Sequence, residues 1–202
     1  MDNSNIVPIT QKSPKDDMYS SGVFRDGTDV WQPRGAHIMC IAGGDPDTVD
    51  AQAFNNATEL SLNESVYMTG AHPASIDFDL ALAKSVVDAG RKLRLFISDA
   101  DYLTGYDVER IVELSESGNA RVVVTQMCCD KSTIPYLLTY IGAVIFLHRT
   151  DDPIYALSMG FSEDLANASL QLSDDEALIK DATGKRGIGT PSFYAVEPSR
   201  RR

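Results

Sequence analysis

Two apolar segments of the sequence end on polar side chains suited to nucleotide hydrolysis. RKLRLFISDADYL, residues 91–103, leads to Asp99, and NARVVVTQ, residues 119–126, leads to Thr125 and Gln126. An aspartate in such a place can hold a magnesium-bound water. No GxxxxGK[ST] phosphate loop occurs in the chain, however, and that loop supplies the phosphate contacts that hydrolysis needs. The sequence therefore predicts the scaffold of a nucleotide site without its full chemistry.

Apolar runs alternate with amphipathic patterns from residue 36 onwards. Runs such as RLFI, RVVVT and AVIFLH are apolar throughout, which is typical of strands in a sheet covered on both faces. Alternation with helices favours crossover connections and parallel strands. We therefore expect an α/β domain of three layers, a mostly parallel sheet with helices on both faces. The expected strands are 36–43, 65–71, 93–98, 120–125 and 143–149, and the expected helices are 47–60, 75–90, 104–117, 132–142 and 151–160.

The two ends of the chain differ in composition from the part between them. Residues 1–34 are rich in Asn, Ser, Pro, Gly and Asp without periodicity, which predicts an extended or disordered N-terminal arm. Residues 199–202 form a basic tail. With 202 residues, 43% of them hydrophobic, the chain can support one α/β domain with a substantial core. We place that domain at residues 35–198.

Cysteine usage and hydropathy indicate the compartment. The three cysteines, Cys40, Cys128 and Cys129, form neither a disulfide framework nor a zinc-binding spacing. The N-terminal residues lack a charged-then-apolar signal pattern, and no stretch reaches the roughly 18 apolar residues of a membrane span. We expect a soluble, cytoplasmic protein.

The formal net charge of −11 argues against broad binding of nucleic acid, because the phosphate backbone would be repelled. Two local clusters of positive charge exist, at Arg91, Lys92 and Arg94 and at residues 200–202. We interpret the first as a solvated turn between a helix and a strand, and the second as a frayed end. Direct nucleic-acid binding is therefore not expected.

The order of these elements resembles the P-loop motor fold of the FtsK–HerA kind, and most closely the ATPases of conjugation and type IV secretion. The resemblance rests on a strand ending in Asp, a later strand ending in Thr-Gln, and a region with a basic Gly turn. That last region is LSDDEALIKDATGKRGIGTPSFYAVEP, residues 172–198. The resemblance covers residues 36–198 and implies a RecA-type sheet. It also permits a role for Arg186, in the turn Gly184-Lys185-Arg186-Gly187, as an arginine finger for a neighbouring subunit.

The departures from this family pattern lie at the residues that would contact the nucleotide. The stretch IAGGDPDTVD, which contains Gly43 and Gly44, stands where the phosphate loop would be. If Thr48 takes the magnesium-binding position, Asp47 takes the lysine position, and carboxylates would repel a triphosphate. After Asp99, the position of the catalytic glutamate is occupied by Ala100, which cannot activate water. Together with Gln126, these residues form a vestigial nucleotide site that predicts a pseudo-ATPase.

Simpler interpretations of the same residues stay open. Asp99 can be a turn residue at the end of a strand, Gln126 can bond to neighbouring backbone, and Arg186 can belong to a basic hairpin turn.

Other side chains with reactive or ligating groups favour structural roles. The aspartates Asp45, Asp47 and Asp50 lack EF-hand spacing and favour capping of a helix over binding of a cation. The adjacent Cys128 and Cys129 favour partly buried thiols over a nucleophile. The three histidines are scattered along the sequence and predict no metal site.

Three functional hypotheses follow. The first is a domain without catalytic residues or cofactor that binds a protein partner, either a motor ATPase or another copy of itself, as a scaffold or accessory subunit of a translocation machine. The second is a divergent NTPase that binds Mg-nucleotide weakly and is completed by a partner in trans. The third is a small α/β binding module unrelated to motors.

Overall fold

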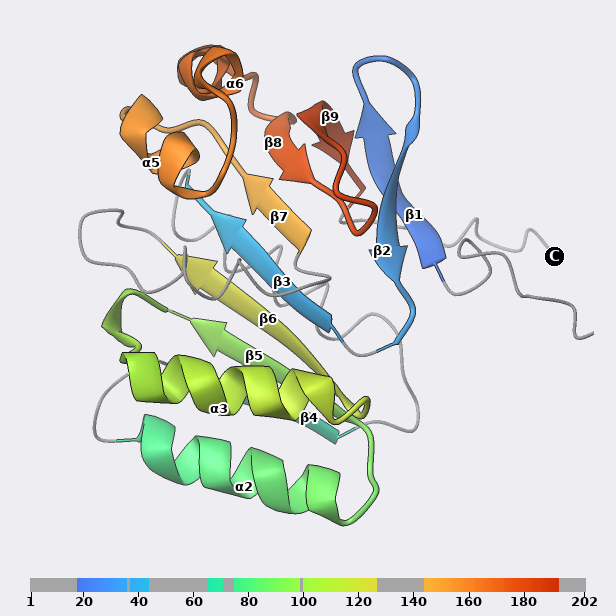
Figure 1. Cartoon of the computed structure of the whole chain (residues 1–202), viewed down its shortest axis with the longest axis vertical. Helices are drawn as coiled ribbons and strands as arrows, with labels where there is room; N and C mark the ends of the chain where they lie inside the picture. The colour runs from blue at the N-terminus through green and yellow to red at the C-terminus, as the bar shows by residue number, and fades with distance from the viewer. Residues whose placement is uncertain are drawn as a thin grey trace, which may run out of the picture.

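The computed structural model describes residues 18–35, 37–43, 65–70, 75–98, 100–126 and 144–192, with residues 65–70 described by their backbone alone. These residues form one nine-stranded sheet (Figure 1). Its strands are β1 Met18–Phe24, β2 Asp29–Pro33, β3 His37–Ala42, β4 Ser65–Gly70, β5 Leu93–Ser98, β6 Ala120–Gln126, β7 Val144–Leu147, β8 Ala177–Lys180 and β9 Arg186–Pro191.

The sheet has two halves of different strand direction. The strand order is β2-β1-β9-β8-β7-β3-β6-β5-β4. The run from β7 to β4 is parallel, whereas β8, β9, β1 and β2 continue the sheet antiparallel. The predicted α/β fold with a parallel core is therefore confirmed, and the core is extended at one edge by antiparallel strands.

The described helices pack on one face of this sheet. They are α2 Ile76–Asp88, α3 Gly105–Glu116, α5 Pro153–Ser158 and α6 Glu163–Ala168, with the short 3-10 turns η2 Ala100–Tyr102 and η3 Ser169–Gln171. In Figure 1, α2 and α3 lie over the β4–β6 side, and α5 and α6 lie beside β7 and β8. The predicted helices over residues 47–60 and 132–142 lie outside the described residues. Among the described helices, none is long and apolar enough to cross a membrane.

Both faces of the central parallel strands are buried, as the uniformly apolar strands predict. Every residue of β3 and β6 is buried. Because side chains alternate across a strand, Ile38 and Cys40 join the cluster under the described helices, whereas Met39 and Ile41 join a second cluster with Phe146 on the opposite face. Strands buried on both faces leave little room for polar side chains except at their ends.

Local sequence explains where α2 and α3 begin and end. The buried residues of α2 follow helical spacing, from Ile76 through Leu80 to Val87, and the helix is followed by Gly90 at φ +73°. Ser75 holds the N-cap position without a side-chain cap hydrogen bond. In α3, Thr104 and Asp107 form a capping box, in which each side chain accepts a hydrogen bond from the other residue's backbone N–H.

Residues 18–33, expected to be part of an extended arm, instead form the β1–β2 hairpin. The chain turns at Asp26 and Gly27, where Gly27 has φ +81° and the Asp26 carboxylate accepts hydrogen bonds from the backbone and hydroxyl of Thr28, at 3.0 and 2.6 Å. Phe24 and Val30 are buried in the second core cluster. An Asp-Gly turn between apolar runs is a hairpin signal, and burial of these side chains gives the segment the stability that its composition does not suggest.

Three basic side chains lie side by side at the amino edge of the parallel strands. His37 of β3 pairs in register with Arg121 of β6, and Arg121 pairs with Arg94 of β5. Their exposed fractions are 4%, 7% and 2%. The prediction of a solvated turn at Arg91, Lys92 and Arg94 is wrong for Arg94, because strand β5 already begins at Leu93 and carries the guanidinium into the sheet.

A buried carboxylate fixes the turn between β8 and β9 against the hairpin. Asp181 is 1% exposed. It accepts hydrogen bonds from the backbone N–H of Thr183, Lys185 and Trp31, at 2.9, 3.0 and 3.3 Å, and one from the Thr183 hydroxyl at 2.6 Å. Because Trp31 belongs to β2, this side chain joins the two antiparallel hairpins.

We expect Asp181→Ala to lower the free energy of unfolding by about 2 kcal/mol, because it leaves buried N–H donors without acceptors. Urea unfolding followed by circular dichroism measures the change. Asp175→Ala, which removes an exposed carboxylate from the same region, serves as the control and is expected to change stability by less than about 0.5 kcal/mol. Equal losses in the two variants would contradict the anchoring role of Asp181.

The buried His37 predicts a pH dependence of stability. Burial, and next the nearby Arg121, lower its pKa to about 4 from 6.5. Between these two pH values the unfolded chain binds a proton that the folded chain does not. The contribution of His37 to stability is therefore complete above pH 6.5 and falls with pH, by up to about 1.4 kcal/mol for each pH unit.

We expect His37→Gln to flatten the dependence of the free energy of unfolding on pH between 6.5 and 4. Urea unfolding at a series of pH values measures both slopes. Parallel curves for wild type and variant would show that His37 titrates normally in the folded chain.

Candidate functional site

The strand order brings the predicted site strands together at their carboxyl ends. β6 lies between β3 and β5, and Ala42 at the end of β3 is in register with Gln126 at the end of β6. Ligands of parallel α/β sheets bind at this edge. The two segments that end on Asp99 and Gln126 are thus neighbours, as the interpretation of a shared site requires.

Gly43 ties the ends of three strands together. Its N–H donates to the Gln126 carbonyl at 3.2 Å, and the N–H of His148, just after β7, donates to the Ala42 carbonyl at 2.8 Å. Gly43 has φ +71°, and a Cβ there would lie 3.1 Å from the His148 carbonyl oxygen and 3.2 Å from Leu147 Cδ1. Only glycine fits both the left-handed backbone and this close approach.

Gln126 and Asp101 contact each other above these strand ends. The Gln126 side chain is fully buried, and its Nε2 donates to Asp101 Oδ1 at 3.0 Å. If strand β5 continued past Ser98, the Asp101 side chain would point in a different direction. Instead, the chain leaves the sheet after Ser98 and turns through η2, which brings the Asp101 carboxylate to Gln126. Residue spacing alone does not reveal this pair, because the contact depends on the turn.

Two small buried side chains lie on η2 and on β3, the strand beside β6. Ala100 is 0% exposed and belongs to the core cluster under the helices. Cys40, two residues before the end of β3, is also fully buried. Burial is the main cause that raises the pKa of its thiol well above the ordinary value, and the Asp101 carboxylate is the second cause. Cys40 is therefore a neutral thiol and not a nucleophile at neutral pH.

Arg186 lies apart from this edge. It opens β9, which is separated from β3 by β8 and β7 in the sheet. Its side chain is exposed and faces Gly160, with 3.9 Å between Nη2 and a Cβ built on that glycine. Arg186 is in register with Lys180, whose pKa is lowered by burial and by this guanidinium. Arg186 does not reach the strand ends of its own chain, and its role toward a neighbouring subunit stays a prediction.

The remaining predicted site residues lie outside the described residues. They are Gly44, Asp47, Thr48 and Asp99, together with Asp45, Asp50, Cys128 and Cys129. Within the described ranges, no three His, Cys, Asp or Glu side chains gather in a way that could hold a metal ion. The described polar contact at the strand ends is that between Asp101 and Gln126, with the backbone of Gly43 and the residues after β7, His148 and Arg149, beside it.

Comparisons with known proteins show which fold this is. No protein-family model matches the chain, and no curated protein matches it in sequence. Solved structures do match. The DNA-packaging ATPase B204 of Sulfolobus Turreted Icosahedral Virus is 13% identical with a TM-score of 0.57, over 76% of this chain and 97% of that one. The chain has the fold of P-loop motor ATPases.

Two further structures support this assignment of the fold. The cytoplasmic domain of the Thermomonospora curvata type VII secretion ATPase EccC is 8% identical with a TM-score of 0.59, over 95% of this chain and 28% of that one. The pCW3 conjugation coupling protein TcpA is 9% identical with a TM-score of 0.59, over 90% of this chain and 67% of that one. The resemblance to motor ATPases drawn from element order is confirmed at the level of the fold.

The geometry at Gly43 predicts a difference between two glycine substitutions. Gly90 has nearly the same φ, +73°, but nothing lies within 4 Å of a Cβ built on it. Both Gly43→Ala and Gly90→Ala place alanine in the left-handed region, at a cost of about 1 kcal/mol. We expect Gly43→Ala to lose about 1 to 3 kcal/mol more, because the methyl group would press on the β7 loop. Denaturant unfolding of both variants checks this, and equal losses would contradict the close approach.

Proposed function

We propose that this chain is a non-catalytic ATPase-like domain that serves as a scaffold or accessory subunit of a translocation machine. The observation that carries the proposal is Ala100. In the motor family that the chain resembles, the residue after the strand-end aspartate is a glutamate that activates water. Here it is a methyl group that is fully buried in the core.

Burial makes this difference more than a missing functional group. Ala100 packs in the cluster that contains Val108 and Val124, so a longer, charged side chain at this position would have to be taken out of water. The local packing is thus adapted to alanine. The phosphate-loop position adds a second departure, since IAGGDPDTVD has no lysine.

The structural neighbours suggest the kind of machine. B204 is a DNA-packaging ATPase, EccC is a secretion ATPase and TcpA is a conjugation coupling protein. All three are named for processes in which a polymer or protein is moved. A degenerate domain of the same fold keeps the surfaces with which motor subunits associate, and we propose such association as its role.

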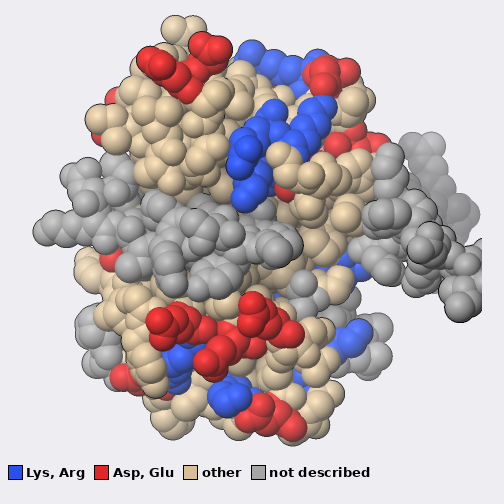
Figure 2. Space-filling view, in the orientation of Figure 1, with Lys and Arg blue, Asp and Glu red and all other residues tan. Residues whose placement is uncertain are grey.

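The surface charge favours a basic protein partner. Figure 2 shows Asp and Glu side chains gathered over the part of the molecule where α2 and α3 lie in Figure 1. Five acidic residues of these helices are exposed, namely Asp77, Asp88, Glu109, Glu113 and Glu116. Lys84 and Arg110 lie on the same helices and pair with Asp88 and Asp77. The remaining excess of acidic charge directs association toward a partner of opposite charge. We place this association in the cytoplasm.

One observation favours a second candidate function, a divergent Mg-dependent NTPase. Asp101 lies one residue beyond the expected glutamate, yet η2 turns it to within 3.0 Å of Gln126. A carboxylate held there by an amide could orient water in place of the glutamate. A partner subunit would then have to supply the missing cation in trans.

Nucleotide binding and turnover separate the two functions. If the domain is non-catalytic, we expect no phosphate release from MgATP or MgGTP. If it also has no nucleotide site, we expect no rise in thermal stability at millimolar nucleotide. A ligand at a hundred times its dissociation constant would add about 2.7 kcal/mol. Differential scanning fluorimetry and a phosphate-release assay measure the two effects.

Phosphate release that Asp101→Asn abolishes would overturn the non-catalytic proposal and support the second function. Asp174→Asn, at an exposed aspartate between η3 and β8, is the matched control and is expected to leave both measurements unchanged. If nucleotide raises the thermal stability but is not hydrolysed, the non-catalytic proposal stands. The nucleotide would then be a structural ligand at the carboxyl edge of the parallel strands.

A further inference from the structure

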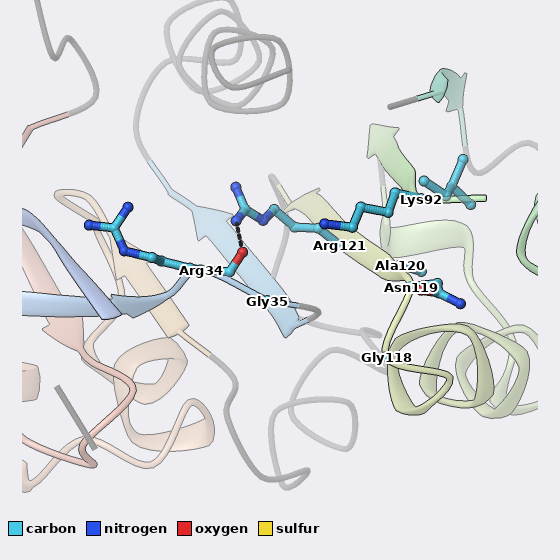
Figure 3. A pocket seen from close by; sticks show the side chains of 8 residues that line it. Arg34, Gly35, Lys92, Gly118, Asn119, Ala120 and Arg121 are labelled. Atoms are coloured by element: carbon cyan, nitrogen blue, oxygen red, sulfur yellow. Dashed lines mark hydrogen bonds between the residues drawn. The ribbon is translucent and has the colours of Figure 1, made fainter. Parts of the chain in front are cut away.

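A small basic pocket lies at the amino edge of the sheet, at the end of the parallel strands opposite to Gly43 and Gln126. It has a volume of about 50 Å³ and lies where β5 and β6 begin, next to the segment that leads into β3. Figure 3 shows the side chains around it. The lining residues are Arg34, Gly35, Lys92, Leu93, Gly118, Asn119, Ala120 and Arg121.

The charge of this lining is opposite to that of the whole chain. Three of its eight residues are basic and none is acidic, although the chain carries a formal net charge of −11. In Figure 3 the Lys92 side chain, which comes from the start of β5, extends toward Arg121 of β6, so that both cationic groups border the same space. Both groups are donors of charge-assisted hydrogen bonds, which anions accept.

Arg121 is held in position by the neighbouring chain. Its Nη2 donates to the Arg34 carbonyl oxygen at 2.9 Å, the dashed line in Figure 3. The Arg34 guanidinium itself points away, where its Nε donates to the Met18 carbonyl at 3.2 Å and its Cζ lies 5.9 Å from the centroid of the Tyr19 ring. Arg34 therefore positions Arg121 through its backbone, and Lys92 and Arg121 are the cations of the pocket.

Burial strengthens the field of these cations. Arg121 is 7% exposed, and the adjacent Arg94 is 2% exposed. Charges that water screens poorly act more strongly on a ligand than charges on an open surface. The low pKa of His37, the next side chain in the row, has Arg121 and Arg94 among its causes. This agrees with a positive potential at the amino edge.

We propose that this pocket binds the phosphate group of a small molecule. A planar guanidinium and an ammonium are the side chains that proteins use for this group. The pocket volume of about 50 Å³ is several times the cavity volume of roughly 10–15 Å³ that one water molecule needs. It admits a single phosphate group, with the remainder of a phosphomonoester lying outside.

Nucleic acid is the less favoured source of this phosphate. The pocket contains two convergent cations, whereas a backbone needs an extended basic track to offset the repulsion of an acidic protein. The site is also separate from the edge at which the fold binds nucleotides, since it lies at the opposite ends of β3, β5 and β6. It does not depend on whether the chain hydrolyses a nucleotide.

Isothermal titration calorimetry of the full chain, at constant ionic strength in a chloride buffer, tests the proposal. The probes are inorganic phosphate, AMP and a single-stranded oligonucleotide without a terminal phosphate. We expect phosphate or AMP to bind, and Lys92→Gln to weaken that binding about tenfold, the effect of losing one charge-assisted hydrogen bond. Lys84→Gln, the same change at an exposed lysine of α2 that pairs with Asp88, is expected to leave binding unchanged.

The two small probes identify the source of the phosphate. Binding of both, lost in Lys92→Gln, supports a site for phosphate as such, and binding of AMP alone supports a phosphomonoester. Because Lys92 is exposed, its substitution leaves the core intact, and circular dichroism confirms the fold of both variants.

Three outcomes would overturn the proposal. The first is the absence of binding by phosphate and AMP to the wild type. The second is equal weakening in Lys92→Gln and Lys84→Gln, which would mean a diffuse effect of charge. The third is binding of the oligonucleotide alone, which would make the basic edge a nucleic-acid contact instead of a small-molecule site.

Discussion

The burial of β6 between β3 and β5, with both of its faces covered, is the constraint on which the rest of the structure depends. All seven residues of β6 are buried, so its polar side chains, Arg121 at the start and Thr125 and Gln126 at the end, have to find partners where the strand enters and leaves the sheet. Because β3 and β5 pair in register with β6, the polar side chains at their ends also need partners there. As a result, polar chemistry is concentrated at two edges about one strand length apart.

The parallel half of the sheet could be predicted from the sequence because its signals are local. Strand β5 begins and ends where the apolar run LRLFIS does, and the expected strands at β3, β4, β6 and β7 differ from the observed ones by one or two residues at an end. Uniform apolarity identifies a strand buried on both faces without reference to any partner. The antiparallel half lacks this property. In MYSSGVF, of strand β1, polar Ser21 is buried while Val23 is exposed, so composition suggests a loop even though an Asp-Gly turn follows.

The candidate site could be predicted only in part, for a similar reason. The edge and its strands follow from element order, and Gln126 was expected there. The contact between Gln126 and Asp101 could not be derived, because it requires the chain to bend into η2 immediately after Ser98. The requirement for glycine at residue 43 could not be derived from the sequence either. It arises from the His148 carbonyl, which is more than a hundred positions away in sequence and 3.1 Å away from the Cβ position in space. Contacts between strand ends depend on sheet order, which periodicity does not encode.

The two edges of the parallel strands carry different side chains among the described residues. At the carboxyl edge, the Asp101 carboxylate and the Gln126 amide contact each other near the buried Ala100, and His148 and Arg149 follow strand β7. At the amino edge, Arg94, Arg121 and Lys92 lie together. The Arg121 guanidinium donates to the Arg34 backbone carbonyl, which holds it beside Lys92 at the pocket. Because the buried middle of a strand excludes polar groups that lack partners, the strands that meet at the carboxyl edge also bring a set of basic side chains together at their other ends.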